Sequence, residues 1–291
     1  MEANPRWLVG LDLLPQSTGV LRVAEWLRAG AEPAHCVGVH VVETGLLRFV
    51  GERTSAILDA ARVTLEETLR DADAIEAFTA LEAIAAPDAE HGLVAAAARH
   101  QATGMVLGRW SRRGDTSLIR LGRVSRRILR ELPVPVIVTP PDLTGPELAG
   151  DGPLVLATDL SDASAEAARF AVGLARGQGR RLIIVYVAVP ITHASLYVLD
   201  DEWEVLRRQE EQLVAGRVDA WARAHAPGAE VVIAAGQVAE RLLEVQRGRG
   251  AVMIVVGSRR LSLVERIFGS SLASGLAAIA PCPVAVVPPP L

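Results

Sequence analysis

The sequence repeats its own landmarks at a nearly constant offset. Two short apolar segments, residues 7–12 and 154–159, each end in an aspartate, and Asp12 and Asp159 lie 147 residues apart. Three further landmarks keep that offset to within two residues, namely the pairs Gly108 and Gly257, Gly122 and Gly269, and Pro135 and Pro283. An offset shared along the chain indicates an internal duplication, so the sequence predicts two related domains.

A segment rich in proline and glycine separates the two copies. Residues 140–152 show no helical or strand periodicity, which is typical of a connection between domains. We therefore predict a first domain at residues 1–141, a linker at residues 142–152 and a second domain at residues 153–291.

Each copy alternates strand patterns with helix patterns. In the second half we predict strands near 153–158, 181–189, 229–235, 251–257 and 283–288, and helices near 162–177, 202–225, 237–248 and 269–280. In the first half we predict strands near 7–12, 35–42, 76–85, 103–108 and 134–139, with a long helix at 56–69. This alternation predicts an α/β fold in which each domain is a doubly wound, Rossmann-like parallel sheet with helices on both faces.

A candidate ligand loop follows the apolar run at residues 252–257. The run ends in Gly257, and a new helix pattern begins at Gly269-Ser270-Ser271. Glycine lets the backbone come close to a bound group, and the free N–H groups at a helix start favour an anion. The segment 257–271 is therefore a candidate phosphate cradle.

Composition narrows the range of functions. The formal net charge of −4 gives the chain no general attraction to nucleic acid or anionic lipid. All 30 basic residues are arginine, and the lack of lysine excludes a Schiff-base enzyme and a P-loop.

The start shows no signal-peptide pattern, and no apolar run approaches the roughly 20 residues that span a bilayer, so we expect a cytoplasmic protein. Cys36 and Cys282 are expected to be buried free thiols.

The residues resemble those of the universal stress proteins. The second half does so in residues 157–171, Gly236 and residues 257–287, and the first half in Asp12 and His40-Val41. The resemblance covers both halves, hence a tandem form. It implies a five-stranded sheet of order 3-2-1-4-5 in each domain and contacts through the fifth strands, which here would make an intrachain pseudo-dimer. It also implies that some members bind ATP, with magnesium, through the motif G-x2-G-x9-G-[S/T].

The resemblance places candidate nucleotide contacts in both domains. In the second domain they are Asp159, Val187, Gly257, Arg260, Gly269, Ser270 and Ser271. In the first domain a weaker set consists of Asp12, Val41, Gly108, Ser111 and Gly122. Because the first and fourth strands are neighbours where the winding reverses, the loops after Asp159 and Gly257 should open onto one crevice. The alternative that each aspartate caps the following helix stays open, and Ser161 and Ser17 could do the same.

Neither half satisfies the family motif. The second half has Arg260 at the second glycine position and eight residues, rather than nine, before Gly269. The first half has Ser111 there, ten residues before Gly122, and then Arg123 in place of serine or threonine. The Arg260 side chain either fills the pocket or supplies positive charge to a phosphate. We expect the second domain to be the competent one if either binds nucleotide.

Arginines are concentrated in the first half, within 22 residues whose only acid is Asp115. They are Arg109, Arg112, Arg113, Arg120, Arg123, Arg126, Arg127 and Arg130. One account is a docking site for an anion or a phosphorylated partner. The account that we favour is an exposed helix face paired with acids from elsewhere in the chain. Nucleic acid is disfavoured, because only Trp110 stands among the arginines to stack on bases.

Two hypotheses for function follow. The first is a regulatory ATP-binding protein of the stress response with a degenerate motif, and the second is a non-nucleotide interaction protein acting through dimerisation or partner docking. We expect no enzyme beyond slow ATP hydrolysis, since the sequence has no nucleophile elbow, zinc-ligand spacing or G-x-G-x-x-G. A homodimer of four domains is expected to form through the helical faces. An insertion at residues 190–200 is interpreted as a solvent loop rather than a lid.

Overall fold

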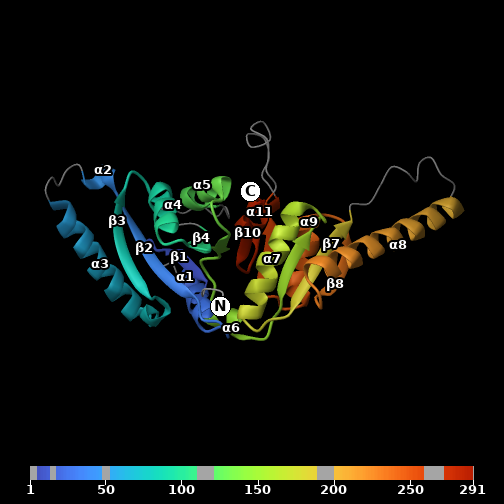
Figure 1. Cartoon of the computed structure of the whole chain (residues 1–291), viewed down its shortest axis with the longest axis horizontal. Helices are drawn as coiled ribbons and strands as arrows, with labels where there is room; N and C mark the ends of the chain where they lie inside the picture. The colour runs from blue at the N-terminus through green and yellow to red at the C-terminus, as the bar shows by residue number, and fades with distance from the viewer. Residues whose placement is uncertain are drawn as a thin grey trace.

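The computed structural model describes residues 5–13, 18–47, 53–109, 121–188, 200–258 and 272–290. Ten strands within these residues form one sheet (Figure 1). They are β1 (Arg6–Gly10), β2 (His35–Glu43), β3 (Ala80–Ala86), β4 (Gly104–Gly108), β5 (Val136–Thr139), β6 (Leu154–Thr158), β7 (Leu182–Ala188), β8 (Glu230–Ala235), β9 (Met253–Gly257) and β10 (Val284–Val287).

Helices connect these strands. They are α1 (Thr18–Arg28), α2 (Thr44–Leu47), α3 (Thr54–Asp71), the 3-10 helix η3 (Ile75–Ala77), α4 (Ala89–Arg99), α5 (Arg123–Glu131), α6 (Gly145–Ala149), α7 (Asp162–Gly177), α8 (Asp200–His225), α9 (Val238–Gly248) and α11 (Leu272–Ile279). The long helix α8 points away from the body of the protein at one end of Figure 1.

Local sequence explains the central elements. Strand β6, with the sequence LVLAT, is buried at every position, because it lies in the interior of a parallel sheet with helices on both faces. Helix α7 buries Ala167, Ala168, Ala171 and Ala175, the spacing of one helical face. It begins after Ser161, whose hydroxyl accepts a hydrogen bond from the amide of Ser164 as an N-cap.

The strand order is the one that the resemblance to the universal stress proteins implied. It runs β3-β2-β1-β4-β5-β10-β9-β6-β7-β8, so each half has the order 3-2-1-4-5. Neighbouring strands within each half are parallel. This confirms the α/β fold with tandem doubly wound domains.

The two halves meet through their fifth strands, as predicted. Strands β5 and β10 pair antiparallel, with Ile137 opposite Ala285 at the centre of the ladder. Each strand begins directly after a proline. The carbonyl of each proline accepts a hydrogen bond from the neighbouring strand, Pro135 from the Met105 amide at 2.8 Å and Pro283 from the Ile254 amide at 3.1 Å. The pairing covers two apolar edges that would otherwise be exposed to other chains.

The apolar core forms two layers, one on each face of the sheet. One layer packs β-strand side chains against α1, α3 and α7, and the other packs them against α4, α5, α9 and α11. Both layers contain residues of both halves, for example Trp7 and Phe170, whose rings meet edge to face at 6.2 Å. The halves therefore share one continuous core across the join.

Two segments differ from the sequence-based prediction. The strand predicted to start near residue 76 starts at Ala80, because the chain leaves α3 through Asp73, with a φ of 53°, and Ile75–Ala77 form η3. Residues 142–152 contain helix α6, with Leu148 2% exposed in the core. The domain boundaries themselves remain a prediction.

Candidate functional site

The candidate crevice of the second domain lies where β6 and β9 run side by side. Ala157 on β6 is opposite Val256 on β9, so Asp159 and Gly257 follow at the same carboxyl edge of the sheet. The helix after β6, α7, packs in one core layer and α11 packs in the other. The winding therefore reverses between these two strands, which is where open α/β sheets bind ligands. In the first domain β1 and β4 have the same relation, which brings Asp12 and Gly108 to one edge.

Asp159 is exposed, and a hydrogen-bond network holds its carboxylate. Its Oδ1 accepts from the Ser161 amide at 3.1 Å, from the Ser161 hydroxyl, and from the Ser164 hydroxyl at 2.7 Å. The Asp159 amide in turn donates to the Ser164 hydroxyl at 3.2 Å. The carboxylate thus helps to organise the first turn of α7, which is the capping role that the sequence left open, and Ser161 is the N-cap itself.

The residue after each aspartate has left-handed backbone. Leu13 has a φ of 56° and Leu160 a φ of 66°, although neither is glycine. Such conformations cost of order 1–3 kcal/mol and persist where the surrounding structure holds them, often at ligand sites. The strained turn occurs in both copies, and sequence reasoning missed it, because leucine gives no turn signal.

Gly257 is needed for packing. A Cβ atom added there would lie 2.4 Å from the Ala163 carbonyl oxygen, so the end of β9 touches the first turn of α7. At its counterpart Gly108 the nearest atom to such a Cβ is Val20 Cγ2, at an ordinary 3.6 Å. The two glycines that the sequence treats as equivalent therefore have different surroundings.

The two valines among the predicted contacts lie near the carboxyl ends of their strands. Val41 on β2 and Val187 on β7 are half-buried and pack against the core layer that contains α4 and α9. Beside Val41, the His40 Nδ1–H donates to the Leu11 carbonyl at 2.8 Å, which ties the ends of β2 and β1 together. The remaining predicted positions, Ser17, Ser111, Arg260, Gly269, Ser270 and Ser271, lie outside the described residues, as does 190–199 of the insertion.

In the first domain, polar groups at the start of α5, where a phosphate would bind, already donate hydrogen bonds to backbone carbonyls. The amide of Gly122, the N-cap residue of α5, donates to the Arg109 carbonyl at 2.6 Å. The Ser125 hydroxyl donates to the Gly108 carbonyl at 2.6 Å. The start of α5 is therefore bound to the end of β4.

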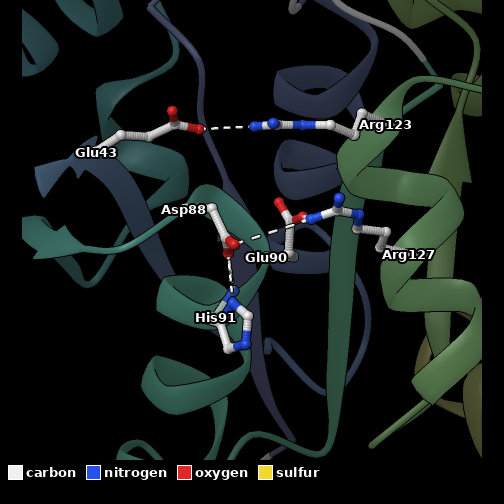
Figure 2. Close-up of polar contacts among 6 residues, drawn as sticks. All are labelled: Glu43, Asp88, Glu90, His91, Arg123 and Arg127. Carbon is white, nitrogen blue, oxygen red and sulfur yellow. Dashed lines mark hydrogen bonds and ion pairs between the residues drawn. The ribbon is translucent and has the colours of Figure 1, made fainter. Parts of the chain in front are cut away.

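Acidic side chains face the basic side of α5 (Figure 2). Arg123 Nη2 lies 2.8 Å from Oε1 of Glu43 at the end of β2, and Arg127 binds Oε1 of the buried Glu90. Asp88 Oδ2 lies 3.9 Å from Arg127 Nη1. This supports the paired-face account for Arg123 and Arg127, and the sequence could not identify these acids, since they come from distant segments. Arg112, Arg113 and Arg120 lie outside the described residues.

Asp88 also caps α4. Its Oδ1 accepts from the His91 amide at 2.9 Å and lies 2.6 Å from His91 Nδ1. The backbone hydrogen bond lowers the pKa of Asp88, and the side-chain hydrogen bond raises the pKa of His91. The second oxygen of Glu90 is buried without a hydrogen-bond partner among the described residues.

Arg109 departs from the account of an exposed basic face. It is 5% exposed, and its guanidinium crosses the join between the halves to donate to the carbonyl of Ala280, just after α11. The last carbonyls of a helix lack partners within the helix, so they attract such a donor. Burial lowers the pKa of Arg109, and the charge of Asp142 opposes that shift.

Both cysteines lie in the apolar core. Cys36 and Cys282 are buried and free, as predicted, and burial raises the pKa of each thiol to about 12. In the described part of the chain, no group of three or more histidine, cysteine or acidic side chains could hold a metal ion. None of the helices there is long and apolar enough to cross a membrane.

Comparison with known proteins identifies the family. The model of the universal stress protein family matches the chain twice, at residues 4–140 and 152–288. The chain therefore belongs to the universal stress protein family, in a tandem form.

Relatives match one domain or both. The "Universal stress protein in QAH/OAS sulfhydrylase 3'region" of Thermus aquaticus is 33% identical over 135 residues, which are 46% of this chain and 96% of that protein. Universal stress protein YxiE of Bacillus subtilis is 29% identical over 143 residues, 46% of this chain and 97% of its own. A universal stress protein structure from Archaeoglobus fulgidus covers 98% of both chains at a TM-score of 0.64 and 21% identity, which shows the fold across both domains.

Proposed function

We propose that the chain is a regulatory nucleotide-binding protein of the stress response, and that its second domain binds ATP, with magnesium, in the crevice between β6 and β9. The observation that carries the proposal is the exposed carboxylate of Asp159 at the carboxyl edge of β6, beside the strand that leads into residues 258–271. Ligands of doubly wound sheets bind at this place.

Each candidate group has a chemical role in this proposal. The Asp159 carboxylate would accept hydrogen bonds from the ribose or the adenine, and the strand end at Val187 would border the base. The loop after Gly257 and the helix start at Ser270 and Ser271 would hold the phosphates, because amides at a helix start bind anions. Arg260 would add positive charge if it reaches a phosphate.

The hydrogen bonds of Asp159 favour binding as well as helix capping. The hydroxyls of Ser161 and Ser164 fix the orientation of the carboxylate before any ligand arrives. A pre-oriented acceptor loses little conformational entropy on binding, which supports affinity.

The first domain is the weaker candidate. The Gly122 amide is bonded to the Arg109 carbonyl, and Arg123 is paired with Glu43. A phosphate near Asp12 and Gly108 would have to displace these contacts, so we assign the nucleotide to the second domain.

Calorimetric titration with ATP and magnesium tests the proposal. Replacing Asp159 by alanine removes a charged acceptor worth about 1.5–3 kcal/mol, so Asp159→Ala should weaken binding tenfold or more, while Asp12→Ala should bind like the wild type. Thermal unfolding of both variants checks that they are folded. The opposite pattern would overturn the choice of domain.

The alternative function is a protein that interacts with partners without nucleotide. One observation favours it, since the Asp159 carboxylate already serves the first turn of α7. A wild-type protein that gives no heat with ATP and magnesium would support this alternative and reject nucleotide binding.

A further inference from the structure

A cavity of about 340 Å³ lies in the second domain at the opposite edge of the sheet from the crevice. It reaches Leu182 and Glu230, the first residues of β7 and β8, whereas Asp159 follows the last residue of the parallel strand β6. Cavities that bind small molecules have volumes of about 300–1,000 Å³. The cavity thus has a suitable size and lies apart from the proposed nucleotide site.

The charged lining of this cavity is mostly positive. Arg176, Arg180 and Arg181 line it, against one acid, Glu230. Glu230 is itself neutralised, because its Oε1 lies 2.6 Å from Arg249 Nη2. The charged residues of the lining therefore carry a net positive charge, which favours an anionic ligand.

The three arginines differ in the contacts that their side chains already make. Arg180 donates to the Leu148 carbonyl at 2.8 Å, and Arg176 lies 3.6 Å from Glu32 in the first half. Arg181 is exposed, and among the described residues its side chain has no hydrogen bond or ion pair. Arg181 is therefore the arginine whose charge a ligand can take up without breaking an existing contact.

The rest of the lining is largely apolar. Val172 on α7 is 37% exposed, and Pro227, which is exposed, and Ala229, which is half-buried, add to the apolar surface, whereas Leu182 and Ala226 are buried beneath it. A simple inorganic ion would leave this surface in water, whereas a ligand with a hydrocarbon body would cover it. The lining fits a molecule with an anionic head and an apolar body.

We propose that this cavity is a second ligand site, for a small organic anion that carries a phosphate or a carboxylate on an apolar body. The anionic head binds at Arg181, and the apolar body lies against Val172 and Pro227. The site is independent of the crevice between β6 and β9, and it requires no nucleotide there.

Calorimetric titration of the full chain with phenyl phosphate and with benzoate tests this proposal. At least one of the two should bind the wild type, and Arg181→Gln should weaken that binding about tenfold or more, as expected for a lost charged hydrogen bond. Inorganic phosphate should bind more weakly than phenyl phosphate, because it leaves the apolar surface uncovered. The control is Arg223→Gln, at an exposed arginine of α8 outside the cavity, which should bind like the wild type.

A second variant covers the apolar part of the site. Val172→Asp places a negative charge beside the bound anion and should also weaken binding, while titration with ATP and magnesium should be the same in both variants as in the wild type. Two results would overturn the proposal: neither probe binds the wild type, or Arg181→Gln and Val172→Asp bind the probe as tightly as Arg223→Gln does.

Discussion

At the scale of single residues, equivalent positions of the two copies have taken different roles. Gly257 touches the backbone of α7, since an added Cβ would lie 2.4 Å from the Ala163 carbonyl oxygen, whereas Gly108 leaves room for one. The glycine of the second domain is thus required by the fold as well as suited to a ligand loop. The close packing that requires glycine at position 257 does not occur at the equivalent position 108.

This difference predicts unequal costs of adding a methyl group. Gly257→Ala should lower the free energy of unfolding by about 1–3 kcal/mol, because the new Cβ meets a backbone atom that cannot rotate away. Gly108→Ala should be neutral or slightly stabilising, since alanine restricts the unfolded chain. Urea unfolding of both variants gives the comparison, and equal effects would contradict the packing described for Gly257.

Only part of the candidate site could be predicted from the sequence. Asp159 and Gly257 come to one edge as expected, because the alternation of strands and helices predicts a parallel sheet and the resemblance to the universal stress proteins implies that the first and fourth strands are neighbours. The contact of Arg109 with Ala280 could not be predicted, because it joins residues 171 positions apart across the two halves. Side-chain pairing over such separations depends on packing that no local pattern records.

At the scale of elements, the fifth strands carry the join between the halves. The resemblance to the universal stress proteins implied this pairing, and the pairing covers two apolar strands that would otherwise be exposed edges. Sequence reasoning missed helix α6, although Thr144 and Glu147 have the spacing of a capping box and their side chains bond at 2.5 Å. The proline and glycine content of residues 140–152 outweighed that short signal.

Separate expression of the halves tests the role of β5 and β10. Residues 1–145 and 151–291 should each self-associate, or should recombine on mixing, because each exposes an apolar edge strand that is buried in the full chain. Sedimentation velocity measures the result. Halves that stay soluble monomers, alone and together, would contradict this account of the join.

At the scale of the whole molecule, one continuous sheet brings two candidate ligand sites to equivalent strand edges, and the two sites differ in their surroundings. The second has the Asp159 network and a glycine packed on α7, and the first has Arg123 and Arg127 paired with acids. Because of these differences, we expect the second domain to bind a ligand and the corresponding contacts of the first domain to stabilise the fold. Association of whole chains into a homodimer stays a prediction.

The stoichiometry of ATP binding tests this account most directly. Equilibrium dialysis of the full chain against ATP and magnesium should saturate at one nucleotide per chain, and Asp159→Ala should abolish or strongly weaken that binding. Saturation at two nucleotides per chain would contradict the prediction that the first domain binds no nucleotide. No bound nucleotide, or one that Asp159→Ala leaves unchanged, would contradict the proposed site in the second domain.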